Sequence, residues 1–417
     1  MDAELKLSAS QYSHVASIFL VGYLLFQLPG TLLVRKIGPP LQFGGAMLGW
    51  GTVTACTVLV HGYASLMITR VFVGCCEAFV QGAVFYLSFW YPYNELATRG
   101  AIFWSMSALA GAFNGLIAYA VQQNLAHVNS WQPWRWIFLI EGVVPIGWAF
   151  VVWILLPSTP EKTKLYFNED EKALIVKRSR RAFNTGESKI VPKLIVKLLL
   201  DPKFWLLVVV QSANLFCLTS LSNFLPAILH GFGWSTVKSQ LMTVIIYACA
   251  FVNIIFSARL SDKIRQRGLV VLVNSTIGAV GYILLLTLTN PSGRFAGACV
   301  VALGVYPNVV IVLTWTATIN VGYTFRASAA ALINSIGQAV AIGSNEAYND
   351  PPFYRRGHGS ALGMIGAELV FCTLLLLLLR YENNRKRKEQ FSDQVQELRK
   401  LTIDEIGNKH PDYFFAY

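Results

Sequence analysis

The chain reads Cys372-Thr373-Leu374-Leu375-Leu376-Leu377-Leu378-Leu379 near its C-terminal end, and a helix made of this stretch has no polar face to offer water. Such a helix is buried in a large core or spans a membrane. Similar apolar runs recur along the chain, with lengths near the ~20 residues that cross a bilayer and with short polar loops between them. The 417 residues are 54% hydrophobic and only 13% charged. The sequence therefore predicts an all-α polytopic membrane protein rather than a soluble protein with core helices.

Hydropathy and loop composition divide this membrane protein into segments. We expect about eleven spans, near residues 14–34, 42–61, 67–89, 100–121, 135–156, 204–226, 240–258, 269–289, 295–315, 327–346 and 360–380. The charged stretch 157–203 reads as a cytosolic linker between two helical bundles. The expected organisation is an N-terminal bundle over residues 1–156, the linker 157–203, a C-terminal bundle over 204–380 and a cytosolic tail over 381–417.

The net charge of +12 gives the orientation. Lys and Arg gather in alternate loops, after the first span, in the linker, around residues 259–267 and in the tail from Arg380 onward. This is the positive-inside pattern of a membrane protein and not a nucleic-acid-binding face, so we expect no nucleic-acid partner. With Arg35 and the tail both cytosolic, the number of spans is odd, and residues 1–13 lie outside. We therefore expect a further helix to precede this segment.

Cysteines and histidines give no sign of a metal site, a disulfide framework or an active site. The seven cysteines fall inside expected spans without metal-ligand spacing, and the six histidines are scattered. We expect no cofactor, no metal and no enzyme activity.

Two charged loops resemble each other and occupy equivalent places in the two halves. The second runs from Ala258 to Gly268 and contains Arg259 and Asp262; the first runs from Leu33 to Pro39. Repeated loops are typical of an alternating-access transporter built from repeats. An Asp near one helix end can pair with Arg side chains and helix termini and so hold one conformation. We expect a cytosolic latch, with the gating residues Arg35, Gly38, Arg99, Arg259 and Asp262.

Further motifs add to these loops. They are Leu28-Pro29 with Gly38-Pro39, Arg70-x-x-x-Gly74-x-x-Glu77-Ala78, Trp90-Tyr91-Pro92 with Glu95-Leu96-Ala97-x-Arg99, Gly111-Ala112-Phe113-x-Gly115, Trp134-Arg135-Trp136-x-Phe138-x-x-Glu141-Gly142, Leu156-Pro157-x-x-Pro160-Glu161 and Pro352-x-Tyr354-x-x-Gly357. In combination the chain resembles the major facilitator superfamily, and in particular its anion:cation symporter branch, the fungal allantoate-permease-like group. The resemblance implies twelve spans, of which about eleven are present, because nothing here is similar to the family's Asp-Arg-x-Asn motif in its first span.

The expected span 67–89 carries the richest chemistry. In a continuous helix, Arg70, Gly74, Glu77, Gln81 and Ser88 fall on one stripe. Charged side chains inside a span are costly and face a cavity or each other. A carboxyl in a partly dry cavity can exchange a proton near neutral pH, so we expect Glu77 to couple protons. Arg70 would hold a substrate carboxylate, because its fork matches a carboxylate bidentately. Glu141 is expected to pair with Arg135 instead, and Glu368, in the last span, is a weaker second candidate for the proton site.

Amides inside other spans suggest the rest of a polar path, although interhelical hydrogen bonding is an equal alternative for each of them. The expected substrate-binding set is Arg70, Gln81, Asn114, Gln211, Asn214, Asn334 and Gln338. Together with the resemblance, these residues predict proton-coupled import of a small organic anion, such as allantoate, nicotinate or another vitamin-like carboxylate. The expected partners are that anion, protons and the lipid bilayer, for a monomer in the plasma membrane. The open alternative is a truncated, non-transporting fragment or a sensor of the same family.

Overall fold

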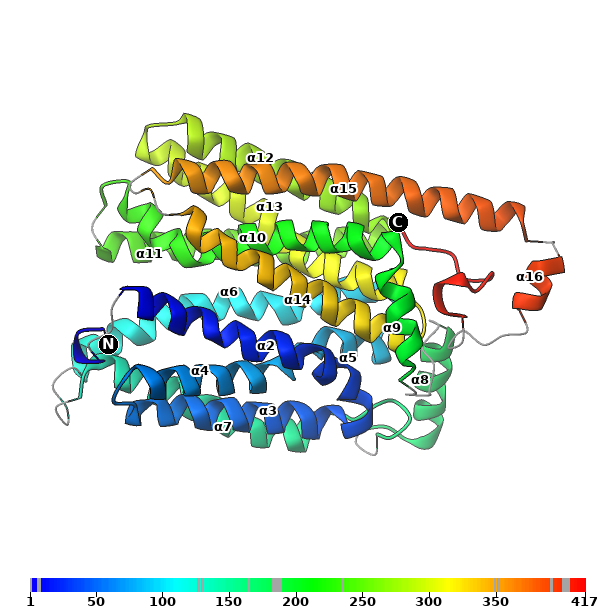
Figure 1. The fold of residues 1–417 in the computed structure, drawn as a ribbon, viewed down its shortest axis with the longest axis horizontal. Helices are drawn as coiled ribbons and strands as arrows, with labels where there is room; N and C mark the ends of the chain where they lie inside the picture. Colours follow the sequence, from blue (N-terminus) through cyan, green and yellow to red (C-terminus); the bar gives the residue numbers. More distant parts are fainter. Residues whose placement is uncertain are drawn as a thin grey trace. The chain divides into compact units, whose positions relative to one another are not determined.

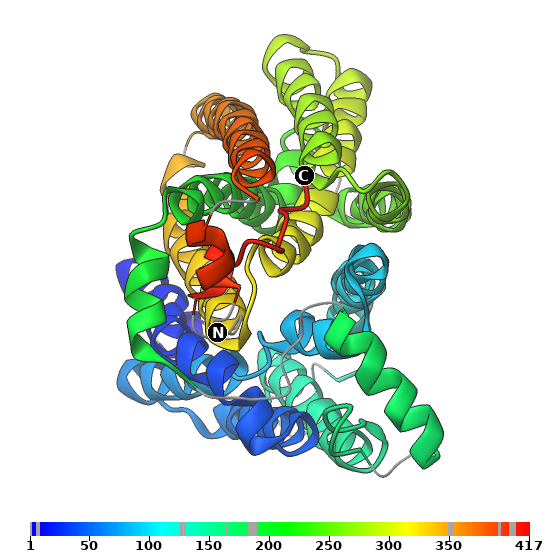
Figure 2. The same cartoon turned by 90° about the vertical axis from the view of Figure 1, so that its right-hand side faces the viewer.

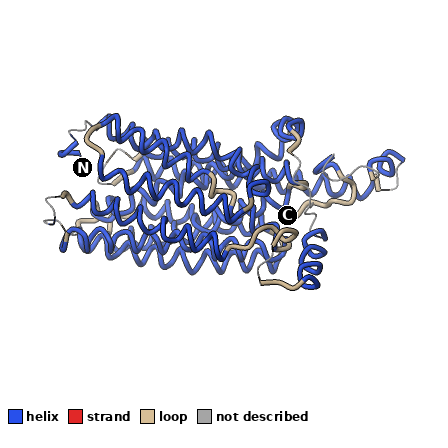
Figure 3. Tube along the Cα trace, turned by 90° about the horizontal axis from the view of Figure 1, so that it is seen from below, coloured by secondary structure: helices blue, strands red, loops and turns tan. Residues whose placement is uncertain are grey.

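The structure is a computed structural model, and it describes residues 2–5, 9–125, 128, 131–163, 166–181, 190–234, 236–348, 350, 353–390, 393–399 and 406–417. These residues form helices joined by loops, and no strand occurs among them (Figure 1, Figure 3). They pack as two compact units: residues 1–90 with 113–178, and residues 91–112 with 179–417. The all-α fold expected from the apolar runs is confirmed.

The first unit contains the helices of the N-terminal half. They are α1 (Asp2–Leu5), α2 (Ala9–Ile37), α3 (Pro39–Cys56), the 3-10 turn η1 (Thr57–Leu59), α4 (Tyr63–Ala78), α5 (Ala83–Trp90), the second part of α6 (Tyr93–Asn124), α7 (Pro133–Leu155) and most of α8 (Glu169–Arg181). Helix α4 lies beside α2 and α3, and α3 lies beside α7 (Figure 1). Gly74 makes the α2–α4 crossing possible, because a Cβ there would collide with the backbone oxygen of Phe19.

The second unit contains the first part of α6 and the C-terminal half. Its other helices are α9 (Pro192–Leu199), α10 (Pro202–His230), α11 (Thr236–Ile264), α12 (Arg267–Thr287), α13 (Pro291–Ile319), α14 (Tyr323–Ala347), α15 (Arg355–Lys388), α16 (Asp393–Leu398) and the 3-10 turn η3 (Gly407–Lys409). Helix α13 is central to this unit and is buried along most of its length. In Figure 2 the end of the chain, drawn in red, lies over one end of these helices.

Nine helical segments of the described chain are long and apolar enough to cross a membrane. They are Ile18–Ile37, Tyr63–Trp90, Pro133–Leu155, Pro202–His230, Met242–Ile264, Arg267–Thr287, Pro291–Ile319, Tyr323–Ala347 and Arg355–Lys388. The expected spans 42–61 and 100–121 are helical too, within α3 with η1 and within α6, but they are not among the nine.

The expected continuous helix over residues 67–89 is wrong in its middle. Helix α4 ends at Ala78, and α5 begins at Ala83. Between them the backbone tightens, since Phe79 and Val80 bond to the carbonyls three residues back, at 3.2 and 3.0 Å. A buried amide supports this break: Nε2 of Gln42 on α3 donates to the carbonyl of Phe79 at 2.9 Å. Gln81 and Ser88 therefore do not continue the α4 stripe of Arg70, Gly74 and Glu77.

Candidate functional site

Glu77 lies in the last turn of α4, immediately before this break. Its side chain is half-buried, and within the described chain no residue gives its carboxylate a hydrogen bond or an ion pair. A carboxyl group at this depth of an apolar helix is costly unless it is neutral or faces water. An interrupted helix is also a frequent feature of transporter binding sites, because the freed backbone groups line a polar space.

Arg70 lies two turns before Glu77 on α4, about 10 Å away along the axis. Its guanidinium lies over the ring of Phe138 on α7, with Cζ 5.2 Å from the ring centre. The guanidinium also interacts electrostatically with Glu141, which like Phe138 lies on α7. The expected pairing of Glu141 with Arg135 is wrong: Arg135 pairs with Glu4 at 2.9 Å, because the N-terminal segment packs beside the start of α7.

The remaining substrate-binding candidates divide between the two units. Gln81 lies in the turn between α4 and α5 and is half-buried, and Asn114 on α6 is exposed; both belong to the first unit. Gln211, Asn214, Asn334 and Gln338 belong to the second unit. The first three are buried, and the aliphatic part of Gln211 packs against Gly337 of α14. The side-chain amides of Gln211 and Asn214, which share a face of α10, therefore point into the second unit.

A buried polar cluster occupies the middle of the second unit. Oε1 of Glu368 on α15 accepts hydrogen bonds from Nδ2 of Asn214 at 2.7 Å and from Nδ2 of Asn308 on α13 at 3.0 Å. Nδ2 of Asn308 also donates to the hydroxyl of Ser275 on α12 at 2.9 Å. Four helices therefore contribute to one cluster. The sequence singled out Asn214 and Glu368 but did not bring them together, and it gave no signal for Asn308 or Ser275.

Asp262 holds together one end of the second unit. It lies in the last turn of α11, and its carboxylate is buried. Oδ2 accepts from the backbone N–H and the hydroxyl of Thr98, near the start of α6, both at 2.7 Å. Nη2 of Arg267, at the start of α12, lies 3.5 Å from Oδ1, and Nη1 of Arg267 donates to the carbonyl of Thr314 at 2.6 Å. The acid thus contacts an arginine and a helix N-terminus, as a latch requires.

The other gating candidates do not share this contact. Arg35 on α2 pairs with Glu161 at 2.6 Å and lies over the ring of Phe89. Gly38 has a φ of +98° between α2 and α3, a conformation that favours glycine. Arg99 pairs with Glu95 on its own helix at 3.5 Å. Arg259 is exposed, and no described residue pairs with it. Arg267 lies in the repeated loop but was not among the expected gating residues, and it is the arginine that meets Asp262.

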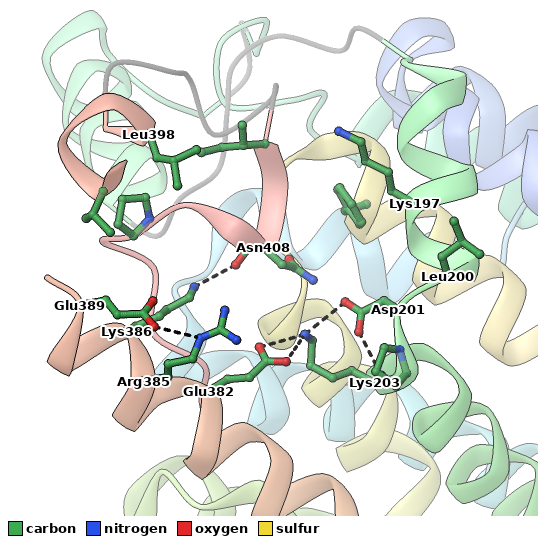
Figure 4. A pocket seen from close by; sticks show the side chains of 15 residues that line it. Lys197, Leu200, Asp201, Lys203, Glu382, Arg385, Lys386, Glu389, Leu398 and Asn408 are labelled. Atoms are coloured by element: carbon green, nitrogen blue, oxygen red, sulfur yellow. Dashed lines mark hydrogen bonds and ion pairs between the residues drawn. The ribbon is translucent and has the colours of Figure 1, made fainter. Parts of the chain in front are cut away.

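The tail folds against the same end of the second unit and encloses a cavity of about 560 Å³ (Figure 4). Nζ of Lys203 bridges Asp201 at 3.2 Å and Glu382 at 2.8 Å on one side of the cavity. On the other side Nζ of Lys386 donates to three tail carbonyls, including that of Asn408 at 2.9 Å. Lys386 therefore holds the end of the chain against α15.

Comparison with known proteins identifies the family of this helical chain. The model of the Major Facilitator Superfamily matches residues 1–344. The chain belongs to this superfamily. It is a multi-pass membrane transporter.

Two fungal transporters are among the curated relatives of this superfamily member. The chain is 30% identical to an uncharacterized transporter of Schizosaccharomyces pombe over 404 residues, covering 96% of this chain and 81% of the relative. It is 26% identical to the high-affinity nicotinic acid transporter of Saccharomyces cerevisiae over 424 residues, covering 100% of this chain and 78% of the relative.

Solved structures show the same fold at low identity. The proton:xylose symporter XylE, bound to 6-bromo-6-deoxy-D-glucose, matches with a TM-score of 0.70 at 12% identity, over 91% of this chain and 88% of that one. A bacterial homologue of the human lysosomal transporter Spinster matches with a TM-score of 0.53 at 16% identity, over 90% of both chains. The major facilitator fold expected from the motifs is confirmed.

Proposed function

We propose that this transporter imports a small organic anion, a carboxylate, together with protons. The proposal is carried by two side chains of α4. The carboxylate of Glu77 has no partner in the described chain, and the guanidinium of Arg70 lies two turns before it on the same helix. Arg70 would bind the substrate carboxylate, in competition with Glu141, and Glu77 would carry the proton. The high-affinity nicotinic acid transporter among the relatives supports a carboxylate as the substrate class.

Energetics favours proton coupling for such a substrate. Importing a monoanion against an interior-negative potential costs about 2.3 kcal/mol per 100 mV. One accompanying proton makes the step electroneutral, and a second makes the potential favourable. We place the protein in the plasma membrane as a monomer, with residues 157–203 and the tail in the cytosol and with bundles over residues 1–156 and 204–380. Alternating access would proceed by rocking of these bundles, with the Asp262 contact and Arg35 as cytosolic latches.

The remaining polar candidates have supporting roles in this proposal. Gln81, Asn114, Gln211, Asn214, Asn334 and Gln338 would line the substrate path, and Gly38, Arg99 and Arg259 would belong to the gates. The substrate itself would be allantoate, nicotinate or another vitamin-like acid.

Uptake of labelled nicotinate and allantoate into proteoliposomes, with and without an inward proton gradient, tests the proposal. The wild-type protein should accumulate one of these carboxylates when the outside is acidic. Glu77→Gln should abolish accumulation but spare exchange of internal for external substrate, because exchange needs no net proton movement. Arg70→Gln should lose both activities.

Glu389→Gln is a matched control, since Glu389 is an exposed acid paired with Arg385 at the surface. It should leave accumulation unchanged. Accumulation that survives Glu77→Gln would show that the proton site is elsewhere. A wild-type chain without pH-dependent uptake of any tested carboxylate would favour the alternative of a non-transporting member of the family.

A further inference from the structure

The carboxyl group of Glu368 is buried in the middle of α15, and the side chain is only 2% exposed. Helix α15 is long and apolar enough to span a membrane, and it packs against α10 and α12. A charge in such a place needs a counter-ion, water or a proton. The neighbours of Glu368 indicate which of these three stabilises its carboxyl group.

All hydrogen-bond partners of Glu368 are uncharged. Its Oε1 accepts from the amides of Asn214 and Asn308, and Ser275 also interacts with it. The titratable groups that face it are the thiols of Cys217 on α10 and Cys372 on α15. Within the part of the chain that the structure describes, no Lys, Arg or His forms an ion pair with it. Hydrogen bonds from amides lower the free-energy cost of burying a negative charge, but they do not neutralise the charge.

The cluster has acceptors in excess. Oδ1 of Asn214 and Oδ1 of Asn308 are both buried without a hydrogen-bond partner in the described chain, while their NH₂ groups converge on the same oxygen of Glu368. The Asn308 amide is held by further hydrogen bonds to the carbonyl of Val271 and the hydroxyl of Ser275, whereas the Asn214 amide has one other hydrogen bond, to the carbonyl of Val210 at 3.2 Å. Rotation of the Asn214 amide by half a turn would present its oxygen to the carboxyl. A proton on Glu368 would then supply the missing donor. The site can therefore hold both forms of the acid: two amide N–H groups serve the carboxylate, and one rotated amide oxygen serves the carboxylic acid.

A second observation connects this cluster to the face expected to bind substrate. Gln211 lies one turn before Asn214 on the same side of α10 and is fully buried, yet neither its nitrogen nor its oxygen has a partner in the described chain. A buried amide with both atoms unpaired indicates that water or a ligand meets it there. Gln211 and Asn214 together form a polar route along α10 that ends at Glu368.

We propose that Glu368 is a second proton-binding site, held by Asn214 and Asn308, which makes anion import electrogenic. This inference rests on the proposed function, in which Glu77 binds the first proton and proton-driven transport requires that proton. The anion then enters with two protons and carries one net positive charge inward. The proton leaves Glu368 toward Gln211 as the Asn214 amide rotates back to donate to the carboxylate.

Proteoliposomes with a controlled membrane potential test the stoichiometry. Wild-type uptake of the labelled carboxylate should be accelerated by an inside-negative potential, even without a pH gradient. Glu368→Gln should keep uptake driven by the pH gradient but lose its response to the potential. Glu389→Gln should behave as wild type. Replacing Na⁺ by choline should change none of these results. If the response to the potential is lost when Na⁺ is removed, the site binds a metal cation and the proton assignment is overturned.

An infrared measurement reads the same group without transport. Purified wild-type protein, titrated with acid in detergent, should show the carbonyl stretch of a protonated buried carboxyl, and Glu368→Gln should lack this band. Asn308→Ala offers a milder variant if Glu368→Gln fails to fold, and it should shift the band, because a hydrogen-bond partner is removed.

The two proposals fail in different ways. The second site would be overturned, and the proposed function would stand, under three joint results. The wild-type protein shows pH-driven uptake, Glu368→Gln responds to the potential as the wild type does, and this substitution removes no carboxyl band. A band that depends on Glu368, in a protein without proton-driven uptake, would instead overturn the proposed function and retain the proton-binding site.

Discussion

Asp262 shows how much one side chain can hold together. Its carboxylate joins the end of α11, the start of α12 through Arg267, and the first turns of α6 through Thr98. The sequence indicated the acid, because an Asp beside Arg residues in a repeated loop is a strong pattern. It did not indicate Thr98, since that contact joins segments more than 160 residues apart. Charge and spacing are local signals, whereas partners depend on packing.

Asp262→Asn should destabilise the second unit by about 3 kcal/mol, because it leaves the buried charge of Arg267 without its carboxylate. Thermal unfolding of the detergent-purified protein, followed by cysteine reactivity, measures the change. Adding Arg267→Gln to Asp262→Asn should recover part of the loss, since the unbalanced charge is then gone.

Arg259→Gln is the control for the Asp262 experiment. Arg259 lies on the same helix but is exposed and unpaired in the described chain, so its loss should change stability by less than about 0.5 kcal/mol. Equal effects of Asp262→Asn and Arg259→Gln would mean that the buried contact contributes nothing to stability.

At the scale of the element, the apolar helices were predictable and their interruptions were not. Bilayer thickness sets the length of a span, so hydropathy finds α10, α12 and α13 without knowledge of their neighbours. Hydropathy does not find the break between α4 and α5, because residues 79–83 hold no charge and no proline, and a single glycine, Gly82, does not by itself end a helix. The break is supported from outside, by the amide of Gln42. The binding candidates on this helix were predicted on a stripe that the break divides.

The end of the chain was predicted only as part of a cytosolic tail over residues 381–417, yet it packs into the second unit. The side chains of Tyr413 and Phe415 are 1% and 3% exposed. Asn383 on α15 exchanges two hydrogen bonds with the backbone of Phe415, each at 2.9 Å. The indole of Trp315 donates to the carbonyl of Ala416 at 3.0 Å, and the backbone N–H of Arg267 donates to that of Tyr417. The end of the tail therefore stabilises the start of α12, where Arg267 contacts Asp262.

Acid should loosen this tail. Burial lowers the pKa of His410 below its ordinary value of about 6.5, and the positive charges of Lys386 and Arg399 act in the same direction, against the opposing effect of Asp412. A lowered pKa in the docked state means that the undocked tail binds the proton more readily. Docking is therefore strongest above about pH 6.5 and weakens as the pH falls through the lowered value.

Hydrogen exchange of residues 407–417 at about pH 7.5 and about pH 5.5, corrected for the intrinsic rate, measures this loss of docking. The docked backbone should lose protection at the lower pH, and His410→Gln should remove most of the difference. His14 lies in the first unit, so His14→Gln should leave the difference intact. Protection that is the same at both pH values would show that His410 does not govern the docking.

At the scale of the whole molecule, the charge distribution predicts how the transporter lies in the membrane. Lys and Arg are dense in residues 157–203, around 259–267 and in the tail, and they are sparse in loops such as 288–290. Cytosolic loops retain positive charge during insertion, so the Asp262 contact and the docked tail should face the cytosol. Every gating step that we propose depends on this orientation.

Two single cysteines test the orientation. Glu169→Cys is placed on the linker helix α8, where the native side chain is 90% exposed, and Ser292→Cys is placed in the exposed first turn of α13. Cys56 is the native cysteine with the greatest exposure, so it is first replaced by serine. In intact cells an impermeant maleimide should label Ser292→Cys and not Glu169→Cys, and both should react once the membrane is permeabilised. The reverse pattern would place the Asp262 contact and the tail outside, where neither can act as a cytosolic latch.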